Sequence, residues 1–235
     1  SGGNEKSNFY VGLGVLDQDG VALETYYNRY SARINSDFSA SDKFRMGQSL
    51  NLSYSEQVEF KTADDDDKSL DNAIISLLRM HPLIPVYDIN GGFSSSLGSD
   101  FKGNGLNPKA TAKNGKDNKA INFRAIGNFY AEYDLLKGLT AKTNLGYDIL
   151  STEERTFNPS RVFDANANFS NSLKEEVSNA YNYNWFNTLN YNVSFSDKHD
   201  LNLLAGSEIV KTRRKYFEIF TSDFEFEDNI DTQFV

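Results

Sequence analysis

Apolar and polar residues alternate along seven segments of the chain. The clearest segment covers residues 181–195, where tyrosine, leucine, valine and the one tryptophan alternate with asparagine, serine and threonine. A period of two is typical of a β-strand with one face in an apolar medium and the other in water. We therefore predict seven strands, at about residues 8–16, 26–38, 44–55, 121–133, 139–150, 181–195 and 201–210.

Alternation does not identify the apolar medium, which is either a protein interior or a lipid bilayer. A soluble sandwich or small barrel with a dry core is the ordinary interpretation. The predicted strands are long for such a protein, because strands of soluble domains usually have about 5 to 6 residues. A strand tilted by about 45° needs roughly 9 to 11 residues to cross the hydrocarbon layer, and about six or seven segments meet this length.

The connections between the strands favour the bilayer. Short turns at about residues 39–42, 134–138 and 196–199 alternate with long polar connections at about 56–120 and 151–180. In outer-membrane barrels the short turns lie on the periplasmic side and the long loops lie outside. A soluble sandwich has no physical reason to keep this order, so we predict that the long connections are external loops.

Aromatic residues lie near both ends of the predicted strands. Rings at both membrane surfaces form girdles, because an amphipathic ring favours the headgroup level. Cross-strand aromatic packing accounts for the same positions in a soluble protein, so both explanations stay open. The residues are Phe38, Phe44, Tyr133 and Phe195 beside the short turns, and Tyr54, Tyr181 and Tyr183 near the opposite ends.

One short helix is predicted within the first long connection, at residues 69–80. Ser69 is a candidate N-cap, and Pro82 follows the end of the segment. We expect this helix to pack inside the large external loop. Its apolar residues recur at helical spacing and are Leu70, Ile74, Leu77 and Leu78.

The composition excludes several classes of protein. No apolar run of about 18 residues occurs, so no helix is predicted to span a bilayer. The absence of cysteine excludes a disulfide framework and a thiolate metal site. The formal net charge of -9 and the lack of a basic stripe argue against a nucleic-acid partner.

Two acidic segments are candidates for calcium. Asp64-Asp65-Asp66-Asp67-Lys68 is open to three explanations: a calcium-binding loop, a protease-recognition sequence or a solvated external loop. We favour the solvated loop, because calcium needs about six to eight oxygens at defined spacing. Asp17-Gln18-Asp19-Gly20 lacks the later glutamate of a calcium loop, and we predict a turn there.

The remaining candidate residues lack the spacing of a reactive site. His81 and His199 have no partner pattern for a metal or a triad, so we predict structural roles. The pairs Glu153-Glu154 and Glu175-Glu176 are predicted in loops, where adjacent side chains point apart. Gly91-Gly92 lacks the context of a phosphate loop. We therefore predict a protein that is not an enzyme, with no cofactor and no catalytic or metal-binding residues; the sequence does not identify substrate-binding residues.

The number of strands indicates a larger assembly. Seven is odd, whereas single-chain bacterial barrels have an even number of strands. An open sheet with a lipid-facing side would leave two unpaired edges and a large apolar surface. We predict that residues 1–235 are part of one transmembrane β-barrel domain, an antiparallel all-β segment with long external loops and one short loop helix.

Six blocks of sequence carry a family resemblance, and they follow one another along nearly the whole chain. They are Ser1–Tyr10, Leu16–Val21, Tyr30–Asn35, Pro82–Asp88 with Gly91 and Gly92, Asn107–Ala110, and Lys198–Leu201 running into Ala205–Glu208. In this order they resemble the SusC/RagA-type TonB-linked, or TonB-dependent, outer-membrane transporters, which are plugged barrels that import large nutrients. The resemblance implies an early-to-middle portion of a barrel of about 22 strands, without the plug, the N-terminal domains or the closing strand.

The resemblance also implies partners and a location. The partners would be a SusD-like surface lipoprotein over the external loops, the TonB complex acting through absent segments, the plug and the remainder of the barrel, and the lipid bilayer. The location would be the outer membrane of a Gram-negative bacterium.

The leading hypothesis is therefore TonB-dependent import of a bulky nutrient, either an oligosaccharide or a peptide. The alternative is a soluble, secreted β-rich module that binds carbohydrate or mediates adhesion; a β-rich hydrolase has no supporting residues. Three side chains discriminate between the first two hypotheses. Phe123, Phe129 and Trp185 are exposed on the surface of a barrel and buried inside a soluble module.

Overall fold

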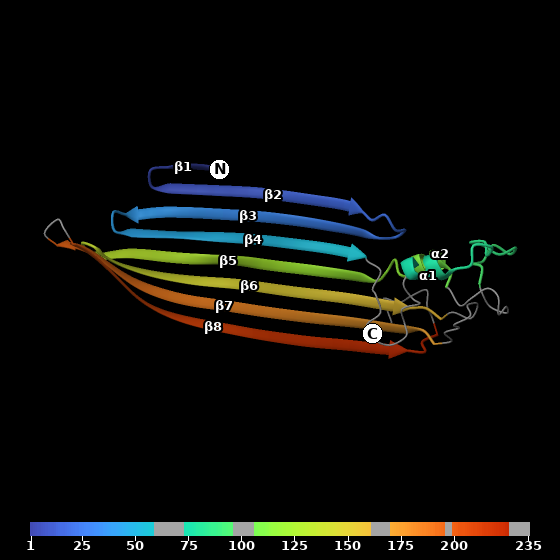
Figure 1. Cartoon of the computed structure of the whole chain (residues 1–235). Helices are drawn as coiled ribbons and strands as arrows, with labels where there is room; N and C mark the ends of the chain where they lie inside the picture. Colours follow the sequence, from blue (N-terminus) through green and yellow to red (C-terminus); the bar gives the residue numbers. More distant parts are fainter. Residues whose placement is uncertain (59–72, 96–105, 161–169, 196–198, 226–235) are drawn as a thin grey trace.

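The described part of the chain forms a single antiparallel sheet (Figure 1). The computed structural model describes residues 1–58, 73–95, 106–160, 170–195 and 199–225. Each strand pairs only with its neighbours in sequence, so the order is β1 to β8 without a crossover. The strands are β1 (Gly2–Asn4), β2 (Ser7–Asp19), β3 (Tyr26–Ser41), β4 (Phe44–Val58), β5 (Lys119–Leu136), β6 (Leu139–Asn158), β7 (Ser172–Phe195) and β8 (His199–Ser222).

The predicted antiparallel all-β fold is confirmed, and the strands are longer than predicted. Strands β6 and β7 extend into the segment 151–180, which we predicted as a loop, and leave only 159–171 as a connection. The predicted loop position of Glu153-Glu154 and Glu175-Glu176 is therefore wrong. All four residues lie on strands that pair with each other. The sequence also gave no signal for the three-residue β1, which pairs with the start of β2.

Two short helices, α1 (Ala73–Arg79) and α2 (Pro108–Asn114), lie beside one another at one end of the sheet (Figure 1). The tight turns that join β3 to β4 and β5 to β6 lie at the other end. Helix α1 falls within the predicted helix, while Ser69 and Leu70 lie outside the described residues. Leu77 and Leu78 are exposed, so these two side chains do not pack in the described part of the loop. None of the described helices is long and apolar enough to span a membrane.

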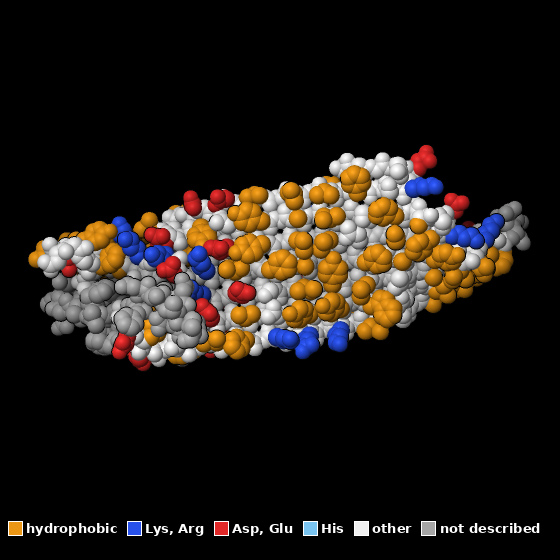
Figure 2. All heavy atoms as spheres, turned by 180° about the vertical axis from the view of Figure 1, so that it is seen from behind, with side chains coloured by type: hydrophobic (Ala, Val, Ile, Leu, Met, Phe, Trp, Pro, Cys, Tyr) orange, Lys and Arg blue, Asp and Glu red, His pale blue; other side chains and the backbone are white. Residues whose placement is uncertain are grey.

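The register places the apolar positions of neighbouring strands opposite one another. One row runs across five strands through Leu13, Ala32, Leu52, Ala125 and Ile149. Because successive side chains of a strand point to opposite faces, this register produces one apolar face and one polar face. Figure 2 shows the apolar side chains as a band across one face of the sheet. We call this band the belt; it covers alternate positions in 9–15, 30–38, 44–54, 121–133, 141–149, 181–193 and 201–209.

No second layer of the described residues covers the belt. Leu13 is 83% exposed and Ile209 is 60% exposed. The three discriminating side chains are also exposed, with values of 44% for Phe123, 47% for Phe129 and 47% for Trp185. The buried apolar residues of the described part instead lie in α2, beside it, or at the helix end of the strands; they are Val58, Leu106, Ala110, Ala112, Ala120, Phe157 and Leu173. A contiguous apolar surface of this extent marks a partner or a membrane.

The belt crosses the strands obliquely. On β2 the belt ends at Val15, and the registers place Val15 in one row with Asn179 of β7 and Lys215 of β8. On β8 the belt ends at Ile209, which is six residues before Lys215. Six strand pairings separate β2 from β8, so the edge of the belt shifts by about one residue from each strand to the next. With about 3.3 Å per residue and about 4.8 Å between strands, the strands are tilted by about 35° to the normal of the belt. Transmembrane barrels have tilts of about 35–45°.

A pair of arginine substitutions on β6 tests whether the belt contacts lipid. Leu145 lies at the centre of the belt on this strand, and Asn144 beside it points to the polar face. We expect Leu145→Arg to lower the free energy of unfolding by about 2–4 kcal/mol, because it places a charge at the bilayer midplane. We expect Asn144→Arg to cost less than about 1 kcal/mol, because an arginine there faces water.

Guanidinium unfolding of the full-length protein in phospholipid vesicles measures both values. Equal losses for the two variants would contradict a lipid-facing belt.

Candidate functional site

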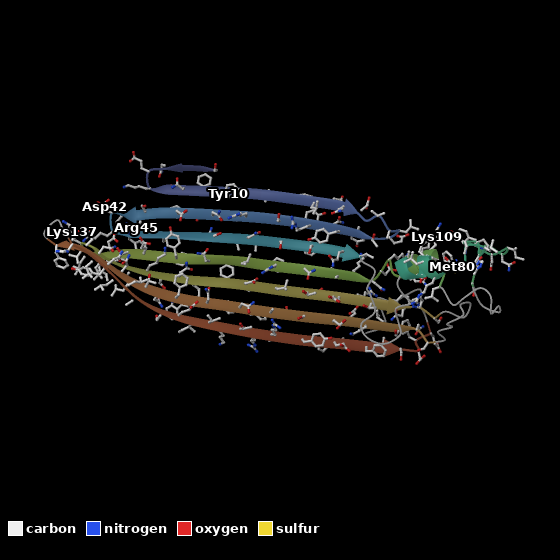
Figure 3. All side chains as sticks on the ribbon, viewed as in Figure 1. Tyr10, Asp42, Arg45, Met80, Lys109 and Lys137 are labelled. Atoms are coloured by element: carbon white, nitrogen blue, oxygen red, sulfur yellow. The ribbon has the colours of Figure 1, made fainter. Side chains whose placement is uncertain are left out.

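The polar face of the sheet carries the side chains that are available for binding. Figure 3 shows these side chains along the whole length of the strands. Serine, asparagine and arginine predominate on β3, β4 and β5. Cross-strand hydrogen bonds join several of them, such as the 2.9 Å bond from Ser49 Oγ to Asn35 Oδ1. This face presents hydrogen-bonding groups with few large apolar side chains between them.

A network of ion pairs lies near the tight-turn end of the polar face, around Arg45 (Figure 3). The Arg45 guanidinium donates to Glu132 Oε1 at 2.8 and 3.0 Å and to Asp134 at 2.9 and 3.0 Å. Lys142 Nζ lies 3.5 Å from Glu132, and Thr140 donates to Asp134 at 2.7 Å. Two cations thus compensate two carboxylates, and the network ties β4 to β5 and β6. Because it is compensated and hydrogen-bonded, it supports the wall rather than offering a free charge.

An aromatic side chain extends this network to β3. Tyr130 donates a hydrogen bond of 2.6 Å to Asp37, and the Lys142 ammonium lies 4.8 Å from the centre of the Tyr130 ring. The register explains this reach across β4. Gly47 lies between Asp37 and Tyr130, so no side chain separates them.

A second group of polar side chains borders a hollow of about 440 Å³ farther toward the helix end. Three arginines line it, Arg29 and Arg33 from β3 and Arg124 from β5. Asp148 holds Arg124 through two hydrogen bonds of 2.9 and 2.8 Å. Small residues lie between the arginines, where Gly14 is paired with Ser31 and Ser31 with Ser53. The hollow therefore exists because three long side chains surround positions that carry almost no side chain.

Arg29 and Arg33 are the uncompensated charges of this hollow. Both are exposed, and neither makes an ion pair within the described ranges. Tyr10 forms part of the rim; a Cβ atom at Gly12 would lie 2.6 Å from its hydroxyl oxygen. A guanidinium presents a planar set of donors that matches carboxylate, sulfate or phosphate oxygens. The hollow thus has the chemistry to hold an acidic group.

The segment Asn107–Ala110, which carried part of the family resemblance, has a structural role in the loop. Asn107 is buried and caps α2, since its Oδ1 accepts from the backbone N–H groups of Lys109 at 3.1 Å and Ala110 at 3.3 Å. Its Nδ2 donates to the carbonyl oxygens of Val86 at 2.8 Å and Ser94 at 3.0 Å. One side chain therefore fixes the start of α2 and the preceding loop together.

Residues of the segment that begins at Pro82 also have a structural role, because they form a turn. Asp88 Oδ1 accepts from the N–H groups of Asn90 at 2.8 Å and Gly92 at 2.9 Å, and Gly91 has a φ of 84°. This turn brings the Tyr87 ring onto Phe93, with 5.5 Å between the centroids. A hydrogen bond from Lys109, on α2, lowers the pKa of the Tyr87 phenol. The turn therefore needs an acceptor at Asp88 and a left-handed glycine.

The structure separates the other candidate residues from one another. His81 lies after α1 and accepts from the Leu83 N–H at 3.3 Å, and His199 begins β8. Asp17 and Asp19 are the last residues of β2 on the belt side, so the turn that we predicted at 17–20 starts only at Gly20. Residues 64–68 lie outside the described residues. Among the residues that the structure describes, no group of three or more His, Asp or Glu side chains gathers for a metal ion.

The arginine hollow is the feature that sequence reasoning missed. Arg29, Arg33 and Arg124 all fall on the polar side of their strands, which the alternation shows. Their proximity depends on the pairing of β3 with β4 and of β4 with β5. A signal was present in the spacing of Arg29 and Arg33, which share one face of one strand.

No protein-family model matches the sequence, but curated relatives do. TonB-dependent receptor P3 of Formosa agariphila is 30% identical over 218 residues, which are 92% of this chain and 21% of that receptor. TonB-dependent receptor P39 of the same organism is 28% identical over 225 residues, which are 95% of this chain and 20% of that receptor. The chain thus spans about a fifth of the length of the curated relatives it matches.

Two solved structures share the fold. The RagAB peptide transporter superposes with a TM-score of 0.77 and 22% identity over 97% of this chain and 25% of its own. The RagAB peptide importer in its open-open state gives a TM-score of 0.76 and 22% identity over 96% of this chain and 24% of its own.

The belt, the strand tilt and the polar face define the class of protein, an antiparallel sheet from the wall of a transmembrane β-barrel. The relatives agree with the family that the six sequence blocks indicate. In sequence the chain is similar to one part of proteins named TonB-dependent receptors, and in fold it is similar to one part of the RagAB transporter, as the resemblance to the SusC/RagA-type transporters predicts.

Substitution of Asn107 tests the structural role of the loop motif. We expect Asn107→Ala to destabilise α2 and the segment around Val86 and Ser94 by about 1–3 kcal/mol, because the helix loses its cap and two carbonyl groups lose a donor. Asn107→Asp keeps the cap acceptor and removes the donor, so we expect increased amide hydrogen exchange at 86–94 with α2 largely protected. Lys116→Ala, at an exposed position just after α2, is the control. Unchanged exchange in Asn107→Ala would show that other contacts hold the loop.

Proposed function

We propose that the protein containing this chain imports a bulky nutrient across the outer membrane of a Gram-negative bacterium, using energy delivered by TonB. The names of the curated relatives support TonB dependence, and the solved structures with this fold are named as a peptide transporter and importer. The exposed belt is the observation that carries the proposal. A soluble binding module would have to cover these side chains, and in the described part of the chain they face outward.

In this proposal the two faces of the sheet have separate tasks. The belt holds the wall in the bilayer, where the backbone groups are satisfied by the strand ladder. The polar face borders the lumen and the plug, which is displaced when TonB acts from the periplasm. No step requires covalent chemistry, so the protein would be a transporter rather than an enzyme. The Arg45 network would keep the wall rigid while the plug moves.

The helix end of the sheet would face the cell exterior. There the loop fixed by Asn107 would lie beneath a SusD-like surface lipoprotein, the partner that the family resemblance implies. Loops held by buried polar contacts present a defined surface to such a partner.

The arginine hollow would contact the nutrient on its way through the lumen. Arg29 and Arg33 are uncompensated and exposed on the polar face, so an acidic group can reach them. We propose that the nutrient is an oligosaccharide or peptide bearing carboxylate or sulfate groups.

Growth assays test the import function. We expect deletion of the gene to abolish growth on one member of a panel of defined oligosaccharides and peptides as sole carbon sources. The full-length gene should restore growth, and the same gene without its TonB-contacting segment should not. Complementation by that truncated gene would refute TonB-driven import.

A double substitution tests the role of the hollow. We expect Arg29→Gln with Arg33→Gln to reduce uptake of an acidic nutrient by roughly 10-fold. A charge-assisted hydrogen bond contributes about 1.5–3 kcal/mol, and water that replaces the lost guanidinium group compensates for part of this loss. Uptake of a neutral analogue should stay unchanged. Arg124→Gln is not a suitable control because it frees Asp148; Lys43→Gln at the tight-turn end serves instead. Equal uptake of the acidic nutrient by wild type and double variant would contradict this role.

A further inference from the structure

Three basic residues follow one another on the belt side of β8. Lys211, Arg213 and Lys215 alternate along the strand, so neighbouring Cα atoms are about 6.6 Å apart on one face. We call this set the basic ladder. The belt on β8 ends at Ile209, and Lys211 is the next position on the same face. In Figure 2 lysine and arginine side chains gather beside the apolar band along the edge of the sheet that β8 forms.

The residues opposite the basic ladder mark the surface of the membrane. On β7, Tyr183 is paired with Lys211, Tyr181 with Arg213 and Asn179 with Lys215. Tyrosine favours the headgroup level, and the change from tyrosine to asparagine marks the passage into water. The basic ladder therefore starts at the edge of the hydrocarbon layer and extends away from it. This edge lies toward the helix end, which is the outer side in the proposed orientation.

The charges of the basic ladder are not compensated within the described part of the chain. The residues paired with it on β7 carry no charge, and the structure describes no ion pair to any of the three cations. On β4 to β7, two pairs of opposite charges lie beyond the belt on the same face. Lys119 lies 3.1 Å from Glu56, and Arg155 lies 3.6 Å from Glu175. Three like charges beside a low-dielectric layer repel one another unless anions lie between them.

A groove in the belt lies below the basic ladder. It has a volume of about 490 Å³ and is lined by small residues of neighbouring strands, among them Ala131, Ala141 and Ala205, with Leu189 at its side. Ser207, also in its lining, is four residues from Lys211, or about 13 Å along the strand. An acyl chain can span this distance. From Ser207 the groove runs across the strands toward Tyr133 and Phe44, so its β8 end is the part that lies nearest the basic ladder.

We propose that the basic ladder binds the phosphate groups of an anionic glycolipid in the outer leaflet, with an acyl chain in the groove. A water-soluble ligand does not explain the continuity with the belt. A second copy of the chain, related by a two-fold axis at this position, would place the same three cations against each other. The inference rests on the proposed membrane orientation and is independent of which nutrient is imported.

Lipid binding by the full-length protein tests this proposal. The probes are phosphatidylcholine nanodiscs that contain either bis-phosphorylated lipid A or its dephosphorylated form, and the readout is retained glycolipid by native mass spectrometry. We expect the triple variant Lys211→Gln, Arg213→Gln, Lys215→Gln to retain bis-phosphorylated lipid A at least 10-fold less than wild type. The matched control is Arg214→Gln, which removes an arginine between the same residues from the opposite face and should behave as wild type.

Several results would overturn the proposal. They are equal retention by wild type and triple variant, equal retention of the two lipid forms by wild type, and an equal loss in Arg214→Gln. Inorganic phosphate is the probe for a free anion, and its tight binding to detergent-solubilised protein would identify a phosphate site without a lipid. A change from dimer to monomer in the triple variant with lipid retention unchanged would assign the face to a second copy.

The folded state of each variant is checked by its heat-modifiable mobility in gels. If the triple variant does not fold, Arg213→Gln alone should reduce retention about 3-fold, and no reduction would overturn the proposal. Nutrient uptake, measured in the same strains, reports separately on the proposed import. Loss of lipid retention with normal uptake would leave the import function standing.

Discussion

The whole arrangement depends on an unbroken register of backbone hydrogen bonds across the strands. In lipid every backbone N–H and C=O group needs a hydrogen-bond partner within the protein. The backbone hydrogen bonds between neighbouring strands from β2 to β8 provide these partners and leave no central strand unpaired. A slip of one residue would turn an apolar row inward and a polar row outward. Among the described strands, the register shifts at Ser39/Ser41 and Asp134/Leu136 lie beside tight turns. They therefore leave the belt continuous.

The same register determines the polar face. Arg45 meets Glu132 because the two residues are direct partners across β4 and β5, and Asp134 lies one position farther on the same face. The arginine hollow arises in the same way, from small residues held in line by three pairings. Inside the lipid layer, polar groups of side chains also need hydrogen-bond partners. Trp185, in the belt, donates its indole N–H to Thr143 at 2.8 Å, so the exposed ring leaves no free donor in hydrocarbon.

Sequence reasoning located the strands because alternation persists wherever one face meets an apolar medium. It failed at the outer ends of β6 and β7, where polar side chains lie on both faces, such as Thr152 on the polar face and Glu153 and Glu175 on the belt face. Alternation disappears there although pairing continues, since hydrogen bonds of the ladder do not depend on side-chain polarity. The arginine hollow was out of reach for a different reason. Arg124 follows Arg33 by 91 positions, and only the strand order makes them neighbours.

The outer edge of the belt carries a different charge pattern in each sector of the wall. On β2 the belt row continues into Asp17 and Asp19, on β4 and β5 into the paired Glu56 and Lys119, and on β8 into the basic ladder. If the charges served only to end the hydrocarbon contact, either sign would be adequate in every sector, because any ion prefers water to lipid. Acidic and paired sectors gain nothing from anionic headgroups, whereas an uncompensated basic sector does. The sign of the charges along the outer edge of the belt therefore distinguishes two roles. Charges in every sector end the contact with hydrocarbon, and the basic charges on β8 suit a specific contact with anionic lipid.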